Sequence, residues 1–251
     1  MIKLSTNTWS IDNIETVLFD KDGTFIDLHY FWGKMTELRA IEIIKKFSLS
    51  KNNFNQVCQF LGYDNLSRKM LPDGITALYS RSKIIEILNK ELMKLNINTT
   101  ENDLAKIFDD VSEQFYENMH LYTKPIIEAI EFIKKLKKYN VKIGIVTSDS
   151  VTSTLLTLKH FQWEQYFDVV IGRESSFHTK ESGEPTKLAL QKLKANPKTT
   201  IMIGDAPMDY ISAQNAKIEK TILVATGQIS EQELKQTSPY TLNSLDKLNI
   251  N

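Results

Sequence analysis

The chain has 251 residues, of which 41% are hydrophobic and 25% charged, and its 31 basic and 31 acidic side chains give a formal net charge of zero. This balance gives no reason to expect a nucleic-acid or anionic-membrane surface, and no apolar run approaches the roughly 20 residues that cross a bilayer. A single cysteine, Cys58, excludes an internal disulfide and a cysteine-based zinc site. The N-terminal segment lacks the apolar core of a secretory signal, so we expect a cytoplasmic protein.

The first predicted element is a short apolar strand, residues 17–19, in the segment ETVLFDKDGT. Asp20 follows this strand directly, and Asp22 and Gly23 come next. An Asp-Gly pair is common in turns because glycine tolerates positive φ. A turn does not explain Asp20, because a carboxylate at the end of a buried strand is costly unless something pairs with it. Asp20 therefore requires a partner from elsewhere in the chain.

The next stretch, from Phe31 to about Tyr116, has apolar residues at helical spacing throughout. The clearest helical faces are formed by Phe54, Val57, Cys58 and Leu61, by Ile84, Ile85, Leu88, Leu92 and Leu95, and by Leu104, Ile107, Phe108, Val111 and Phe115. Thr100 and Asp103 can cap the helix that carries the last of these faces. The pattern predicts a helical insertion, residues 27–121, after the first strand.

Beyond Tyr122 the pattern changes to short apolar runs that alternate with helices. A helix with Pro125 in its first turn ends in the cationic segment KKLKKYN, where Asn140 is a stop signal. The runs VKIGIV, VVIG, TIMIG and TILVA are then predicted as strands. Strands separated by helices indicate a parallel sheet with helices on both faces. The expected fold is α/β, with a core formed by residues 1–26 and 122–251 and an all-α cap at residues 27–121.

Polar side chains follow three of the predicted strands, and two lysines lie between the later two. These residues are Asp20, Asp22, Thr147, Ser148, Lys180, Lys187, Asp205 and Asp209. Open parallel sheets bind ligands just outside the carboxyl ends of their strands, so these side chains can converge on one crevice.

Several acids in one crevice raise one another's pKa values unless a cation neutralises them. Mg²⁺ does so with one or two carboxylates, waters and phosphate oxygens. A nearby hydroxyl and a lysine would hold the remaining phosphate oxygens. The constellation therefore suits phosphoryl transfer, with one acid as nucleophile and another as proton donor.

Four segments, DKDGT, IVTSD, HTKESGEP and GDAPMD, carry a family resemblance. In this order they resemble the four motifs of the haloacid dehalogenase-like hydrolase superfamily, in its phosphoglycolate phosphatase and β-phosphoglucomutase branch. The resemblance covers nearly the whole chain. It implies a Rossmann-like core, and the helical insertion matches the position of the family's cap.

The resemblance implies a role for each acidic motif residue. Asp20 resembles the nucleophile, which forms an aspartyl-phosphate and also binds the metal. Asp22 resembles the general acid/base, whose backbone carbonyl would ligate Mg²⁺. Asp205 resembles a metal ligand, and Asp209 resembles a residue that orients water or the metal.

The resemblance also implies a set of phosphate-binding groups. Thr147 resembles the phosphate-binding hydroxyl, and backbone amides near Asp22 and Ser148 are expected to cradle the phosphate, with Gly23 among the substrate-binding residues. The motif lysine usually stands in Lys-Pro-x-Pro, but here Lys180 is followed by Glu-Ser-Gly-Glu-Pro. We assign Lys180 because it lies on the expected loop. Lys187 is a rival, although it falls inside the helix that is expected to follow.

The leading interpretation is a Mg²⁺-dependent phosphatase that hydrolyses a small phosphorylated metabolite, in the style of phosphoglycolate phosphatases. The alternatives are a sugar phosphomutase of the β-phosphoglucomutase type, which shares all four motifs, and a non-catalytic regulator that binds phosphometabolites. The helical cap is expected to act as a mobile lid over the acids. Its polar residues considered for substrate contact are Lys34, Arg39, Arg68 and Lys69.

Overall fold

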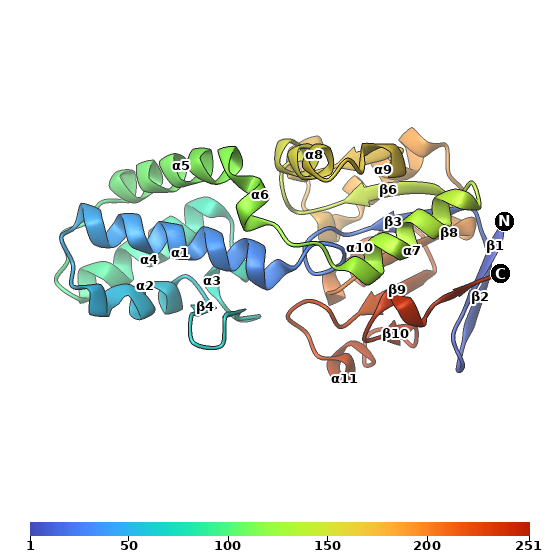
Figure 1. The fold of residues 1–251 in the computed structure, drawn as a ribbon, viewed down its shortest axis with the longest axis horizontal. Coiled ribbons are helices and arrows are strands. Elements are labelled where there is room, and N and C mark those ends of the chain that lie inside the picture. Colours follow the sequence, from blue (N-terminus) through green and yellow to red (C-terminus); the bar gives the residue numbers. More distant parts are fainter. The chain divides into compact units, whose positions relative to one another are not determined.

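The computed structural model describes residues 1–251 and shows an α/β fold built on six parallel strands (Figure 1). The strands run in the order β10 (Thr241–Leu242), β9 (Lys220–Val224), β8 (Thr200–Gly204), β3 (Thr16–Phe19), β6 (Lys142–Val146) and β7 (Val169–Ile171). At the end of β3, Phe19 pairs with Ile145 of β6 on one side and with Ile203 of β8 on the other. The predicted parallel sheet is therefore confirmed.

Helices cover both faces of this sheet, as the alternating pattern predicts. α9 (Glu184–Leu193) and α10 (Pro207–Asn215) supply side chains to the core cluster that contains Leu18 of β3. The next residue of β3, Phe19, meets Phe132 of α7 (Ile127–Lys138), with ring centroids 6.5 Å apart and nearly perpendicular ring planes. Successive side chains of a strand point to opposite faces, so β3 is buried along its whole length. Two further helices of this part are α8 (Val151–His160) and α11 (Glu231–Leu234).

Local sequence signals account for the ends of α7 and α8. The Ser150 hydroxyl accepts a hydrogen bond from the Ser153 amide at 3.0 Å and so caps α8. Asn140 follows α7 with a φ of 58°, in agreement with its predicted role as a stop signal. α7 begins at Ile127, two residues later than the predicted start at Pro125. Pro125 instead forms an extended bridge with Ile26, which holds it outside the helix.

A second sheet joins the two ends of the chain, which lie side by side in Figure 1. Its antiparallel strands are β11 (Asn249–Ile250), β1 (Ile2–Ser5) and β2 (Ser10–Ile14), with β1 in the middle. The sequence analysis assigned no element to these residues. Their apolar positions are few, and the partner of β1 at the C-terminus is only two residues long.

The chain folds as two compact units, one formed by Met1–Asp27 with Lys124–Asn251 and the other by Leu28–Thr123. The second unit consists mainly of helices, which are α1 (Leu28–Lys46), α2 (Phe54–Phe60), α3 (Ile75–Leu78), α4 (Arg81–Lys94), α5 (Glu101–Glu117) and α6 (Met119–Tyr122). It also contains a short hairpin of β4 (Tyr63–Asp64) and β5 (Lys69–Met70), which departs from the helical pattern expected throughout this stretch. Gly62, with a φ of +83°, follows α2 and lets the chain turn into the hairpin.

The predicted helical faces form the core of this second unit. On α4 the buried residues are Ile84, Ile85, Leu88 and Leu92, and on α5 they are Leu104, Ile107, Phe108, Val111 and Phe115. Thr100 caps α5 as predicted, because its hydroxyl accepts a hydrogen bond from the Asp103 amide at 3.1 Å. Arg39 is 6% exposed, and its guanidinium lies 4.0 Å from the centre of the Phe108 ring. Arg39 therefore packs in the interior of this unit and is removed from the residues considered for substrate contact.

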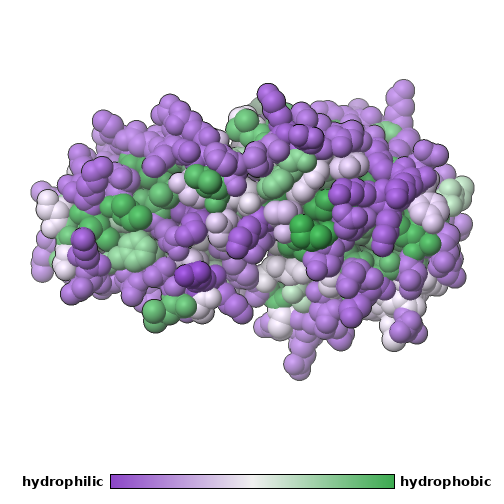
Figure 2. Space-filling model, viewed as in Figure 1, coloured by the Kyte–Doolittle hydropathy of each residue, from purple (hydrophilic) through white to green (hydrophobic).

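The face of the molecule drawn in Figure 2 is mostly polar. Figure 2 shows hydrophilic residues over most of the face in view, with hydrophobic residues in small separate groups. None of the helices combines the length and the apolar character that a membrane-spanning segment requires.

Candidate active site

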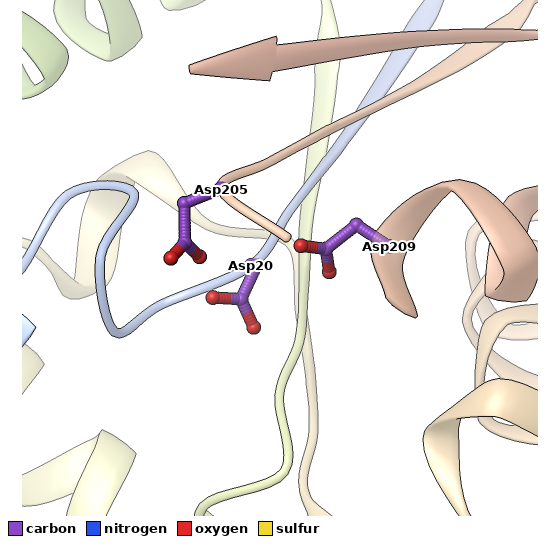
Figure 3. Close-up of side chains that lie close together, drawn as sticks. All are labelled: Asp20, Asp205 and Asp209. Atoms are coloured by element: carbon purple, nitrogen blue, oxygen red, sulfur yellow. The ribbon is translucent and has the colours of Figure 1, made fainter. Parts of the chain in front are cut away.

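Three carboxylates meet at the carboxyl end of the parallel sheet. Asp20 follows β3, Asp205 follows β8, and Asp209 lies in the first turn of α10. One oxygen atom from each carboxylate lies within 4.8 Å of the other two (Figure 3). The three residues are at most 8% exposed. Pairing between strands fixes this meeting point, since the Asp20 amide donates a hydrogen bond to the Ile203 carbonyl at 2.8 Å.

Two glycines make room for Asp205. A Cβ atom at Gly23 would lie 2.2 Å from Oδ2 of Asp205, and a Cβ atom at Gly227 would lie 1.7 Å from the same oxygen. A side chain at either position would therefore displace the carboxylate. The Gly23 amide donates to the Ile26 carbonyl at 2.8 Å, so it is already occupied. Gly23 thus gives Asp205 its space, and its expected contact with phosphate stays a prediction.

Lys180 neutralises part of this acidic group. Its Nζ atom lies 2.5 Å from Oδ1 of Asp20 and 2.6 Å from Oδ1 of Asp209, and the residue is 6% exposed. Lys187, the rival motif lysine, is instead exposed inside α9 and pairs with Glu184 at 2.8 Å. The structure thus brings Lys180, and not Lys187, to the aspartates. We call Asp20, Asp205, Asp209 and Lys180 the Lys180 cluster.

Burial shifts the pKa values of this cluster. Desolvation raises the pKa of Asp209 to about 6, against the opposing effect of Lys180. Desolvation also raises the pKa of Asp205 well above its usual range, and the charges of Asp20 and Asp209 add to that rise. Burial by itself would lower the pKa of Lys180, but the two aspartates outweigh it and the pKa lies above its usual value. One lysine therefore does not satisfy three buried carboxylates.

A divalent cation fits the Lys180 cluster. Its donors are carboxylate oxygens, which are the hard ligands that Mg²⁺ binds, and they already lie within 4.8 Å of one another. Burial raises the pKa values of Asp205 and Asp209, so a bound cation would favour their ionised forms. The buried aspartate group can hold a metal ion, as the sequence predicts.

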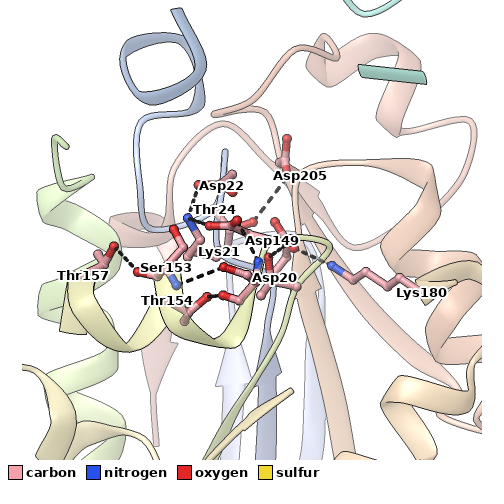
Figure 4. Close-up of polar contacts among 12 residues, drawn as sticks. Asp20, Lys21, Asp22, Thr24, Asp149, Ser153, Thr154, Thr157, Lys180 and Asp205 are labelled. Atoms are coloured by element: carbon pink, nitrogen blue, oxygen red, sulfur yellow. Dashed lines mark hydrogen bonds and ion pairs between the residues drawn. The ribbon is translucent and has the colours of Figure 1, made fainter. Parts of the chain in front are cut away.

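A second group of charges lies beside the first, and Figure 4 shows both. The Nζ atom of Lys21 is 2.5 Å from Oδ1 of Asp22 and 3.1 Å from Oδ2 of Asp149. Desolvation raises the pKa of Asp22 to about 6, although Lys21 opposes the rise. We call Lys21, Asp22 and Asp149 the Lys21 cluster. The sequence analysis singled out Asp22 alone, although the position of Lys21 between two motif acids was a signal that could have been used.

Thr147 and Ser148 follow β6, next to the Lys180 cluster along the sheet edge. Thr147 is 3% exposed, and its Oγ1 atom accepts a hydrogen bond from the Asp149 amide at 3.1 Å. Ser148 lies at the surface, with its hydroxyl 3.8 Å from the sulfur of Met208. Both residues line a cavity that Lys180 also lines.

This cavity has a volume of about 260 Å³ and basic walls. Its lining residues are Thr147, Ser148, Arg173, Ser176, Phe177, His178, Thr179, Lys180 and Pro185. Three of them are basic and none is acidic. The sequence analysis did not single out Arg173, because it belongs to no motif and only the folded loop brings it beside Lys180. It also passed over His178, although this residue opens the motif segment HTKESGEP two positions before Lys180.

Comparison with known families decides the class of the protein. A family model described as "Haloacid dehalogenase-like hydrolase" matches residues 43–224, well over half of the chain. The chain belongs to the haloacid dehalogenase-like hydrolase superfamily. The predicted superfamily and the predicted hydrolase class are confirmed. The matched residues begin after Asp20, so they contain three of the four motif segments.

Individual relatives agree with this assignment. The chain is similar to the pyrophosphatase PpaX of Bacillus mycoides (strain KBAB4), with 29% identity over 94% of this chain and 95% of that protein. Its fold is similar to the crystal structure of a predicted phosphoglycolate phosphatase from Haemophilus somnus 129pt, with a TM-score of 0.72, 16% identity and coverage of 94% and 96%. A HAD-superfamily hydrolase of subfamily IA from Geobacter sulfurreducens PCA gives a TM-score of 0.65 at 17% identity, with 94% of each chain covered. The protein is a hydrolase of this superfamily.

Proposed function

We propose that this protein is a Mg²⁺-dependent phosphatase that hydrolyses a small phosphorylated metabolite through an aspartyl-phosphate on Asp20. The observation that carries the proposal is the Lys180 cluster. A carboxylate stands at the end of the central strand, paired with a buried lysine and two further carboxylates. That arrangement supplies a nucleophile, a cation site and a fixed positive charge at one place.

In the first half of the reaction, an oxygen of Asp20 attacks the phosphorus atom of the substrate. The bond from phosphorus to the leaving oxygen breaks, and that oxygen takes the proton from the Asp22 carboxyl group. Asp20, Asp205 and the Asp22 backbone carbonyl would hold Mg²⁺, and Asp209 would orient it. The bound ion would supply positive charge to the phosphoryl oxygens. Lys180 adds its positive charge next to the Asp20 carboxylate.

In the second half, water attacks the phosphorus atom of the aspartyl-phosphate. The Asp22 carboxylate takes one proton from that water, the bond to the Asp20 oxygen breaks, and inorganic phosphate leaves. The Thr147 hydroxyl, the Ser148 amide and Lys180 hold the phosphoryl oxygens in both halves. Asp22 is therefore returned to its protonated form, and the cycle closes without another reactant.

The basic cavity favours a substrate whose leaving group carries its own negative charge. Arg173 and His178 line it beside Lys180, and no carboxylate is among its lining residues. A phosphate ester of a small carboxylic acid fits this chemistry, in the style of phosphoglycolate. Pyrophosphate also fits, and it is the second candidate because PpaX of Bacillus mycoides is a pyrophosphatase similar to nearly the whole chain. A neutral sugar, which a phosphomutase would bind, gains less from these walls.

The helical unit is proposed to act as the cap of this enzyme. It leaves the first unit directly after the loop that carries the proposed nucleophile. The two connecting segments pair in antiparallel fashion, because the Asp27 amide donates to the Lys124 carbonyl at 2.8 Å and the Ile126 amide donates to the Phe25 carbonyl at 2.9 Å. Motion of the helical unit would thus pivot on a fixed pair of strands.

The test is phosphate release from a panel of small phosphorylated compounds, with Mg²⁺ and with chelator. The panel contains phosphoglycolate, pyrophosphate, glycerol phosphate and β-glucose 1-phosphate with a bisphosphate activator. We expect Mg²⁺-dependent phosphate release, with a preference for phosphoglycolate and pyrophosphate, whose leaving groups carry negative charge. We expect no glucose 6-phosphate. Efficient formation of glucose 6-phosphate would assign the protein as a mutase, and binding without turnover of any compound would assign it as a regulator.

A further inference from the structure

Lys21 is the most completely enclosed charged residue of the site. It is 0% exposed, and its Nζ atom contacts Oδ1 of Asp22 at 2.5 Å and Oδ2 of Asp149 at 3.1 Å (Figure 4). Its backbone carbonyl accepts hydrogen bonds from the amides of the three residues 24–26, at 3.0 to 3.2 Å. Both ends of the residue are therefore fixed.

Asp149 is fixed in turn by the loop after β6. Its Oδ1 atom accepts a hydrogen bond from the Ser150 amide at 2.7 Å, and its own amide donates to Oγ1 of Thr147 at 3.1 Å. Its carbonyl accepts from the Arg173 amide at 2.9 Å. Asp149 is thus an anchor built from the same loop that carries the proposed phosphate-binding hydroxyl.

Stability alone does not account for this buried group. Lysine is almost never fully buried unless it is paired, and a buried ion pair is often no better for stability than apolar residues of the same size. An apolar residue at position 21 would fill the space and would leave Asp22 without a fixed contact. The contact with Lys21 occupies Oδ1 of Asp22 and leaves Oδ2 to carry the proton.

We propose that Lys21, anchored by Asp149, is a positioning residue that sets the direction of the Asp22 side chain for proton transfer to the leaving oxygen. The inference rests on the proposed role of Asp22 as general acid. Lys21 also joins the loop after β3 to the loop after β6, so the proton donor and the phosphate-binding Thr147 are held in one frame.

The consequence is an effect that depends on the leaving group. A 4-nitrophenolate ion departs without a proton, whereas an alkoxide departs only when an acid protonates it. Loss of Lys21 therefore slows transfer from an alkyl phosphate and largely spares transfer from 4-nitrophenyl phosphate. The ratio kcat/KM reports only the steps up to phosphoryl transfer to Asp20. The later step, in which Asp22 takes a proton from water, therefore does not affect this ratio.

The experiment compares kcat/KM for 4-nitrophenyl phosphate and for an alkyl phosphate in wild type, Lys21→Met, Lys21→Arg and Asp149→Asn. Positioned acids contribute roughly 10²–10⁴ in rate. We expect Lys21→Met to lower kcat/KM for the alkyl ester by about 10²-fold or more and for the aryl ester by less than about fivefold. Lys21→Arg should restore part of the loss. Asp149→Asn should also lower kcat/KM more for the alkyl ester than for the aryl ester, by a smaller factor. It replaces Lys21→Met as the test if that variant does not fold.

Two further variants separate the possible failures. Lys187→Met removes a surface lysine paired with Glu184, and it should behave as wild type with both esters. Asp22→Asn should show the strongest dependence on the leaving group. If Lys21→Met and Asp149→Asn lower kcat/KM equally for both esters while Asp22→Asn lowers it selectively for the alkyl ester, the role proposed for Lys21 is wrong and the proposed mechanism stands. No selectivity in Asp22→Asn would overturn the proposed mechanism itself.

Discussion

The protein contains two clusters in which a buried lysine bridges two aspartates. In the Lys180 cluster the Nζ atom lies 2.5 and 2.6 Å from its two carboxylates, and in the Lys21 cluster it lies 2.5 and 3.1 Å from them. The clusters differ in a third carboxylate, because Asp205 joins only the first. With every carboxylate ionised, three negative charges and one positive charge give the Lys180 cluster a net charge of −2, and two against one give the Lys21 cluster −1.

This difference separates the proposed chemistry of the two clusters. A divalent cation brings the Lys180 cluster to neutrality and places positive charge where a phosphoryl group would bind. The Lys21 cluster needs no metal ion, because one proton on Asp22 brings it to neutrality. The same lysine–aspartate unit therefore serves a cation site in one place and a proton donor in the other.

The largest expected effect concerns the nucleophile of the Lys180 cluster. Asp20→Asn keeps the shape of the side chain but replaces a carboxylate by a poor nucleophile. We expect phosphate release to fall by about 10⁴-fold or more, the order that follows removal of a catalytic nucleophile. Circular dichroism should show an unchanged fold. Asp12→Asn, at an exposed residue paired with Lys3, is the matched control and should keep full activity.

The next effect concerns the positive charge of Lys180 itself. Lys180→Ala should lower phosphate release by about 10²–10³-fold, as for removal of one donor that stabilises developing charge. Lys187→Ala should stay within about twofold of wild type, because its partner is an exposed glutamate. Steady-state kinetics on the best substrate of the panel measure both. A larger loss at Lys187 would show that the motif lysine has been assigned to the wrong residue.

A smaller effect tests the basic cavity beside the cluster. Arg173→Ala removes one exposed positive charge from its wall. Because exposed charge pairs contribute about 0.2–1 kcal/mol, KM for pyrophosphate or phosphoglycolate should rise by roughly two- to fivefold. KM for glycerol phosphate should stay constant. An equal rise for all three compounds would argue against a site for a charged leaving group.

The pH dependence of stability sharpens the charge comparison. The pKa of Asp209 is raised to about 6 and that of Asp205 lies well above its usual range. The metal-free folded protein therefore binds more protons than the unfolded chain, and its stability should fall as pH rises from about 4 through 6. Mg²⁺ competes with those protons, so it should raise Tm more at pH 8 than at pH 5. Thermal melts with Mg²⁺ and with chelator measure this, and Asp205→Asn should lose most of the Mg²⁺ effect.

Much of the fold could be predicted because its signals are local. The strand before Asp20 is a buried apolar run, and the helical faces of α4 and α5 follow a spacing that the sequence shows directly. The N-terminal sheet could not be predicted, because β1 pairs with β11 at the far end of the chain and β11 has two residues. The β4–β5 hairpin is similarly short and interrupts a strong helical pattern.

In the site, too, the residues within motifs could be predicted from the sequence, and the contacts that depend on the folded structure could not. Asp20 and Asp205 stand at strand ends that the topology of a parallel sheet brings together, and Asp209 lies in the first turn of the helix that follows Asp205. The contact of Asp149 with Lys21 could not be predicted, because it spans more than a hundred residues and no periodic pattern indicates it. The hydrogen bond from the Gly23 amide to the Ile26 carbonyl could not be predicted, because it depends on the turn geometry of the folded loop.

The most direct test of the central claim is to find where the phosphoryl group goes. Asp22→Asn is mixed with 4-nitrophenyl phosphate and Mg²⁺, quenched in acid and digested, and the peptide masses are recorded. Since this variant lacks the base for the second half of the reaction, the intermediate should accumulate. We predict one added phosphoryl group on the peptide that contains Asp20, absent when chelator replaces Mg²⁺ and absent when Asp20 is also changed to Asn. A phosphoryl group on another residue, or one formed equally well without a divalent cation, would contradict the account.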